Sequence, residues 1–123
     1  MQEMTRERLD RFRNRLAVEI ACLEEELKMM EDNDKINDNE IGNLEQSEYH
    51  FKSCLLEEKK KEQQYIKLWI ESISDDRTRW VFKMWYIEKL NWKIIAKKIG
   101  IPQNENYPRL HIRDKYLKRN KIF

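Results

Sequence analysis

The chain has 123 residues, enough for one ordinary domain or for a small domain with a long helical arm. Charged residues make up 39% and hydrophobic residues 40%, with two glycines and two prolines, a composition typical of long helices rather than sheets. No run of about 18 apolar residues occurs, which excludes a membrane-spanning helix. We therefore expect an all-α protein without a membrane partner.

The net charge of +2 combines two parts of opposite sign. Residues 74–123 contain 13 Lys and Arg against 5 Asp and Glu, a net charge of +8, whereas residues 1–73 contain 12 against 18, a net charge of −6. A basic segment is typical of polyanion-binding proteins, and an acidic one is repelled by DNA. This division predicts an acidic domain for oligomerisation or partner binding at 1–73 and a basic DNA-binding domain at 74–123.

The first predicted helix covers residues 5–30 and carries apolar residues at spacings of three or four. Their mean spacing is about 3.5 residues, the repeat that keeps an apolar stripe facing a partner helix. The charged residues between them are interpreted as a solvated face, with an arginine-rich nucleic-acid arm as the alternative. The stripe consists of Leu9, Phe12, Leu16, Ile20, Leu23, Leu27 and Met30.

Residues 31–43 are rich in Asp and Asn, which compete with the helical backbone by local hydrogen bonding and so predict a turn. Asp38 or Asn39 would cap a second helix over residues 40–73, giving an antiparallel, coiled-coil-like helical hairpin that closes within one chain or is completed by a second chain. Between residues 57 and 64 the stripe fails, so this part is expected to be solvated on all sides or frayed. The apolar positions of the second helix are Ile41, Leu44, Phe51, Leu55, Ile66, Trp69, Ile70 and Ile73.

The two cysteines, Cys22 and Cys54, fall in these two helices and form no zinc-binding pattern. The sequence shows no signal peptide, so nothing in it indicates an oxidising compartment. Buried free thiols and a cytoplasmic protein are therefore expected, with a disulfide as the alternative.

A third helix is predicted over residues 77–90, with a cap among residues 74–76. Five aromatic residues within thirteen positions favour the core of a small domain, and a base-stacking platform is the alternative. They are Trp80, Phe82, Trp85, Tyr86 and Trp92. The residues expected to support the following helices are Val81, Met84, Trp85 and Ile87.

The next two helices form a helix-turn-helix pattern. Asn91 can cap a short helix that ends at Gly100, since glycine adopts a left-handed conformation cheaply and Pro102 discourages continuation. A last helix begins near Tyr107, with Asn106 as a cap and Pro108 in its first turn. The expected inward residues of the two helices are Trp92, Ile95, Ala96, Ile99, Leu110 and Leu117. Such a unit lays its second helix in the DNA major groove.

Several of these residues also carry a family resemblance. The run 80–87, the pairs Asn91-Trp92, Ile95-Ala96 and Gly100-Ile101, and the run 109–111 with Leu117 resemble region 4 of bacterial RNA polymerase sigma factors, and in particular the small phage-encoded regulators of the RinA and ArpU groups. The resemblance covers about the last 45 residues. It implies a promoter-binding helix-turn-helix and RNA polymerase as a partner.

An α-helix advances 100° per residue. If Leu110 and Leu117 point inward, the last helix presents a basic face to the groove. Arginine there can bind guanine, and lysines suit phosphates, so salt-dependent binding is expected; a solvated basic helix is the alternative. Ile112 and Tyr116 form a rival apolar stripe that would rotate the helix. The predicted DNA-binding residues are Lys93, Lys97, Lys98, Gln103, Asn104, Arg109, Ile112, Lys115, Tyr116, Lys118 and Arg119.

Catalytic patterns are absent from the sequence. His50 and His111 lack a nucleophile motif, no glycine loop binds phosphate, and the carboxylates are scattered, so we expect a non-enzyme without cofactor or metal. The predicted function is a phage or mobile-element transcriptional regulator that binds double-stranded DNA, with a homodimer expected. The alternatives are a small terminase-like DNA-packaging subunit and an inhibitor that binds a protein through the acidic hairpin.

Overall fold

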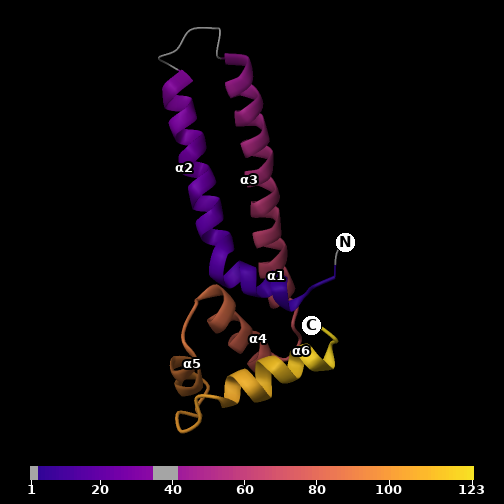
Figure 1. Cartoon of the computed structure of the whole chain (residues 1–123). Helices are drawn as coiled ribbons and strands as arrows, with labels where there is room; N and C mark the ends of the chain where they lie inside the picture. The colour runs from indigo at the N-terminus through magenta and orange to yellow at the C-terminus, as the bar shows by residue number, and fades with distance from the viewer. Residues whose placement is uncertain (1–2, 35–41) are drawn as a thin grey trace. The chain divides into compact units, whose positions relative to one another are not determined.

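The computed structural model describes residues 3–34 and 42–123, and all regular secondary structure in these residues is helical, which confirms the all-α prediction for them (Figure 1). The chain forms two compact units. Unit 1 contains Met1–Asn14 and Tyr65–Phe123, and unit 2 contains Arg15–Gln64. In the sequence, unit 1 has a net charge of +9 and unit 2 of −7. The boundary therefore differs from the predicted one at residue 73, although the two signs of charge are segregated even more completely.

The buried side chains explain why the boundary differs. Leu9, Ile66 and Ile70 have no exposed surface, and all three belong to unit 1. The backbone joins the same regions, because the N–H of Arg6 donates to the carbonyl oxygen of Phe123 at 3.2 Å. The basic C-terminal segment is thus completed by residues from both predicted hairpin helices, which charge counting alone does not detect.

The first helix begins after Thr5, whose Oγ1 accepts a hydrogen bond from the N–H of Arg8 at 3.1 Å. It comprises α1 (Arg6–Arg11), the π-helical segment η1 (Phe12–Leu16) and α2 (Ala17–Asp34). The predicted stripe is buried from Leu9 to Leu27, and Met30 is half-buried. The helix extends beyond the predicted end at Met30. Residues 35–41 of the predicted turn, which include Asp38, Asn39 and Ile41, lie outside the described residues, as does the side chain of Leu44. Gly42 and Asn43, also predicted in the turn, are helical.

Unit 2 pairs α2 with the first part of α3 (Gly42–Glu71). Tyr49 Oη donates to Glu31 at 2.5 Å, and Lys52 lies 3.1 Å from Glu26. Further along α3, Lys59 pairs with Glu19. Later residues of α3 thus contact earlier residues of α2, so the two segments run antiparallel.

The segment in which the apolar stripe fails is helical and makes ion pairs. Lys60 Nζ lies 3.2 Å from Glu24, and Lys61 lies 3.7 Å from Glu57. Of the two predicted alternatives, a solvated or a frayed segment, fraying is wrong: the segment is helical, and charge pairs replace apolar contacts there, each contributing up to about 1 kcal/mol. Phe51, a predicted core residue, is 66% exposed.

Unit 1 contains the three short helices predicted near the C-terminus. They are α4 (Asp76–Phe82), continued by the π-helical segment η2 (Lys83–Ile87), then α5 (Trp92–Lys98), and the π-helical segment η3 (Pro108–Asp114), continued by α6 (Lys115–Arg119). Two of the three predicted caps are present: Asp75 accepts from the N–H of Thr78, and Asn91 Oδ1 from the N–H of Ile94, each at 2.9 Å. The prediction of Asn106 as the third cap is wrong, because the last helix begins after Tyr107 and has no side-chain cap hydrogen bond. The core contains Val81, Met84, Ile95 and Ile112.

Three helix ends in unit 1 use a left-handed residue. Gly100 has φ +86°, with the N–H of Ile101 donating to Ala96 at 2.8 Å, as predicted for this turn. Lys89 and Lys121 occupy the equivalent positions after η2 and α6, with φ of 58° and 55°. Lysine is strained where glycine is not, so these two ends store a small conformational cost.

Cys22 and Cys54 are both free, as predicted, but both are exposed, so the prediction of buried thiols is wrong. Each lies outside the seam that buries Leu23 and Leu27. Within the described residues no helix is both long and apolar enough to cross a membrane.

Candidate nucleic-acid interface

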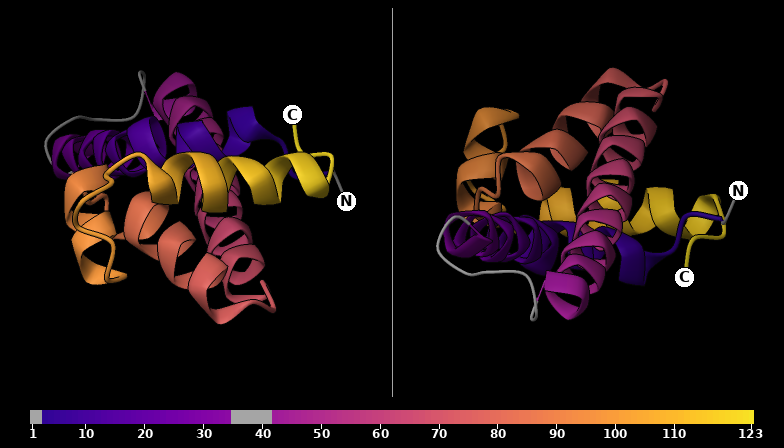
Figure 2. Two further views of the ribbon diagram at one scale, coloured as in Figure 1. Left: turned by 90° about the horizontal axis from the view of Figure 1, so that it is seen from below. Right: turned by 90° about the horizontal axis from the view of Figure 1, so that it is seen from above.

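The last helix of unit 1 does not have the predicted rotation. η3 and α6 form one continuous helix, drawn in yellow in Figure 2, with Pro108 in its first turn. Ile112 is 8% exposed and Leu117 1%, whereas Leu110 is 45% exposed. The prediction that Leu110 points inward and Ile112 towards the groove is therefore wrong. A π-helix joins residues i and i+5, which brings Ile112 and Leu117 onto one face, whereas 100° per residue would separate them.

Tyr116 was also predicted on the groove face, but its ring is half-buried. Its centroid lies 5.3 Å from that of Phe82 and 6.4 Å from that of Trp69, both in edge-to-face geometry. Burial raises the pKa of its hydroxyl above the ordinary value. Tyr116 therefore anchors the helix, as the rival stripe of Ile112 and Tyr116 requires, and contributes only its edge to the surface.

The opposite side of this helix presents His111, Lys115, Lys118 and Arg119, all exposed. We call the last three the cationic face. No carboxylate of the described residues lies within ion-pair distance of these three side chains, whereas the lysines of unit 2 from Lys52 to Lys61 are paired with glutamates. Unpaired cations on one helix face attract a polyanion more strongly than paired ones, because no internal carboxylate competes for them.

Part of the cationic face borders a hollow of about 250 Å³, which we call the basic hollow. Lys115 and Arg119 line it from the last helix, and Arg77 lines it from α4. The guanidinium carbon of Arg77 lies 5.3 Å from the ring centroid of Tyr107, a cation–π contact that leaves its N–H edge free to donate. Tyr107 stacks in turn on His111, with centroids 5.0 Å apart.

Among the described residues, Asp75 is the one carboxylate that lines the basic hollow. It is engaged as the cap of α4, since its Oδ2 accepts from the N–H and from Oγ1 of Thr78 at 2.9 and 2.7 Å. These hydrogen bonds from Thr78, with smaller contributions from nearby arginines, hold the pKa of Asp75 below its ordinary value. The hollow thus retains a net positive charge and suits a phosphate group.

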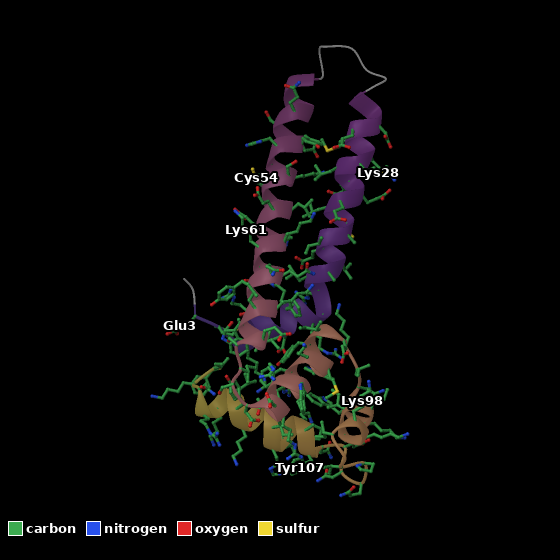
Figure 3. The ribbon with its side chains drawn as sticks, turned by 180° about the vertical axis from the view of Figure 1, so that it is seen from behind. Glu3, Lys28, Cys54, Lys61, Lys98 and Tyr107 are labelled. Carbon is green, nitrogen blue, oxygen red and sulfur yellow. The ribbon has the colours of Figure 1, made fainter. Side chains whose placement is uncertain are left out.

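The other predicted contact residues lie on α5 and in the turn that follows. Lys93, Lys97 and Lys98 are exposed on α5, as are Gln103 and Asn104 in the turn. Figure 3 labels Lys98 on α5 and Tyr107 at the start of the last helix.

Two of the polar side chains near this turn are held by local contacts. Asn104 Oδ1 accepts from the N–H of Asn106 at 3.2 Å, and half-buried Arg109 donates to Asn106 Oδ1 at 3.3 Å. Asn106 thus uses its side chain for Arg109, whereas its backbone carbonyl accepts from the N–H of Leu110 at 2.9 Å.

Trp85 and Trp92 stack at a centroid distance of 4.0 Å and hold the helices of unit 1 together. Arg13 covers one face of Trp85 at 3.6 Å and donates from Nε to its carbonyl oxygen at 2.9 Å. Buried Arg113 lies 4.9 Å from the Trp92 ring. Because arginines cover these rings, the stack belongs to the core rather than to a base-stacking platform.

Sequence reasoning missed Arg77 and His111 as surface residues of this site. Arg77 lies two residues after Asp75, the cap of α4, and the sequence indicated it only as the start of a helix. The positions Tyr107, His111, Lys115 and Arg119 are spaced by four, which places them on one helix face. That spacing is the signal that would have identified the site.

Comparison with protein-family models, curated proteins and solved structures found no match for the chain. In the described residues, no group of three or more His, Cys, Asp and Glu side chains is arranged to hold a metal ion.

Proposed function

We propose that the chain is a sequence-specific DNA-binding transcriptional regulator of phage or mobile-element origin, acting at a promoter with RNA polymerase in a bacterial cell. In this proposal α5, the Gly100 turn and the last helix form a sigma region 4-like helix-turn-helix. The last helix enters the major groove, and lysines of α5 contact phosphates. Unit 2 is an antiparallel helical hairpin that mediates dimer formation or contacts the polymerase.

The observation that carries the proposal is the cationic face with its basic hollow. Lys115, Lys118 and Arg119 are exposed and lack ion-pair partners among the described residues, and Arg77 faces the same hollow. Each cation that meets a phosphate releases a condensed counterion, which favours binding to duplex DNA. Arg109 offers the planar donors suited to guanine, and Lys115, Lys118 and Arg119 suit phosphates.

The acidic charge of unit 2 supports different binding partners for the two units. A net charge of −7 is repelled by DNA, so unit 2 is available to protein partners while unit 1 binds the duplex. The hairpin also exposes Phe51, Val18 and Met29, apolar side chains of a kind that protein interfaces cover.

The test is binding to labelled genomic fragments that carry candidate promoters, measured for the unmodified chain and for Lys115→Ala and Arg119→Ala. We expect selective binding to some fragments and weaker binding for either variant. The matched control is Lys61→Ala, which removes an equal charge from unit 2. Equal affinity for all four proteins, or binding without selectivity, would contradict the proposal.

A second candidate function is inhibition of a host protein by unit 2, favoured by the exposed Phe51 on an acidic unit. It predicts that Phe51→Ser abolishes the biological effect while Arg119→Ala leaves it intact. The opposite pattern supports DNA binding.

A further inference from the structure

A second hollow of unit 1, of about 560 Å³, lies between the α4–η2 helix and the end of α5. We call it the tryptophan hollow. Trp80, Met84 and Ile99 form its apolar part. Trp80 is 54% exposed, although its neighbours Val81 and Phe82 are fully buried. An exposed indole beside two apolar side chains provides a flat surface on which a planar group can stack.

Cations surround this apolar surface. Arg77, Lys83 and Lys98 line the hollow. Lys83 pairs with Glu71 at 2.7 Å, but Lys98 has no carboxylate within ion-pair distance among the described residues. Arg77 lines both this hollow and the basic hollow, where its guanidinium covers Tyr107. The rim therefore offers two cationic groups, Arg77 and Lys98, that an anion can neutralise.

One carboxylate, Glu88, also lines the hollow. Its presence discriminates between ligand classes. A purely apolar ligand would gain nothing from the cations, and an acidic peptide would meet Glu88 as a like charge. A nucleotide can contact the indole, the cations and Glu88 together. Its base has a planar face, a phosphate lies on either side of it, and the N–H groups on the base edge can donate hydrogen bonds to a carboxylate.

We propose that the tryptophan hollow binds an unpaired nucleotide of a single-stranded nucleic acid. The base stacks on Trp80 against Met84 and Ile99, and its flanking phosphates meet Arg77 and Lys98. Glu88 accepts from the base edge. A base in an intact duplex is stacked on both faces and cannot reach Trp80. The tryptophan hollow therefore binds a different ligand from the cationic face.

Glu88 also predicts which bases bind best. Cytosine and adenine offer exocyclic amino groups and guanine offers N–H donors, whereas thymine has a single ring N–H on the same edge. We therefore expect oligo-dC to bind more tightly than oligo-dT. The preference should disappear in Glu88→Ala, which removes the acceptor and leaves the indole in place.

The test measures fluorescence anisotropy with labelled oligo-dC and oligo-dT of about twelve nucleotides, a length within the range that single-strand sites cover, and with a promoter duplex. Trp80→Ala should weaken oligo-dC binding roughly ten-fold, the effect typical of losing one stacked base. Trp80→Phe should retain most of the affinity. In Trp80→Ala, the affinity for the duplex should change less than two-fold. Lys118→Ala should instead weaken duplex binding and leave oligo-dC binding nearly unchanged.

Unchanged oligo-dC affinity in Trp80→Ala would overturn the inference, as would an equal loss of duplex and oligo-dC binding. Binding of a Glu- and Phe-rich peptide that depends on Trp80, in a chain that does not bind oligo-dC, would also overturn it. The two proposals fail separately: duplex binding without Trp80-dependent oligo-dC binding refutes only this inference. Trp80-dependent oligo-dC binding without duplex binding supports this inference and refutes the proposed function.

Discussion

The double substitution Lys115→Ala/Arg119→Ala should reduce the salt dependence of duplex binding. The two residues lie four positions apart on one helix face, line the same hollow, and have no ion-pair partner among the described residues. Each is therefore free to contact a phosphate in the complex. Removing both should eliminate two counterion-releasing contacts without unfolding unit 1, because both side chains are exposed.

The size of the effect follows from counterion release. Each phosphate contact contributes about −0.9 to the slope of log K against log salt concentration, so the double variant should have a slope flatter by about 1.8. Between about 50 and 200 mM salt, this difference makes the variant's loss of affinity about twelve-fold smaller than that of the unmodified chain.

The assay is fluorescence anisotropy with one labelled promoter duplex over a series of salt concentrations. Lys61→Ala serves as the control, because Lys61 lies on unit 2 and pairs with Glu57 at 3.7 Å. Its slope should match that of the unmodified chain. Parallel slopes for the double variant and the unmodified chain would refute the assignment of these two residues to the interface.

Three further predictions concern stability, measured by urea unfolding with tryptophan fluorescence. Arg13→Ala should destabilise unit 1 by about 1–3 kcal/mol through loss of its contact and hydrogen bond with Trp85, whereas Arg11→Ala, at an exposed neighbour, should have little effect; equal losses would contradict this role. Lys89→Gly should stabilise the chain by about 0.5–1 kcal/mol by relieving its positive φ, and Lys89→Ala, which keeps the strain, should not. Burial raises the pKa of Tyr86 to about 12 from 10, so between these values the folded state binds more protons than the unfolded state. Its contribution to the free energy of unfolding is therefore complete below pH 10 and is lost as the pH rises towards 12, by about 2–3 kcal/mol. Tyr86→Phe should remove this loss. The same loss of stability in Tyr86→Phe and in the unmodified chain would refute the assignment of the pH dependence to Tyr86.

Local signals in the sequence predicted the helices of unit 1 well. The caps Asp75 and Asn91 and the left-handed Gly100 depend on nearest neighbours along the chain, so their chemistry can be recognised without tertiary structure. The heptad-like spacing from Leu9 to Leu27 likewise predicted burial, because a regular helix keeps such residues on one face.

The candidate site was predicted less well, because its rotation depends on a π-helix. The rival stripe of Ile112 and Tyr116 indicated the observed rotation, but no residue in the sequence signals the π-helical segment from Pro108 to Asp114 that brings Ile112 and Leu117 onto one face. Leu110 was therefore assigned to the core and Ile112 to the surface. Tertiary packing against Val81 and Ile95, rather than periodicity, decides the register.

The boundary between the compact units differs from the predicted domain boundary for a related reason. Counting charges divides the chain at residue 73, but Leu9 and Ile66 contribute to unit 1 from distant parts of the sequence. Such contacts leave no local pattern in a single sequence. The lysines of residues 57–64 similarly gave no sign of their glutamate partners on α2.

Lysine footprinting tests the central claim most directly. The chain is acetylated with and without a bound promoter duplex, and the modification of each lysine is quantified by mass spectrometry. We predict that the duplex protects Lys115 and Lys118 from acetylation and leaves the extent of acetylation of Lys28 and Lys61 in unit 2 unchanged. Protection confined to unit 2, or equal modification of Lys115 and Lys118 in both samples, would contradict the account.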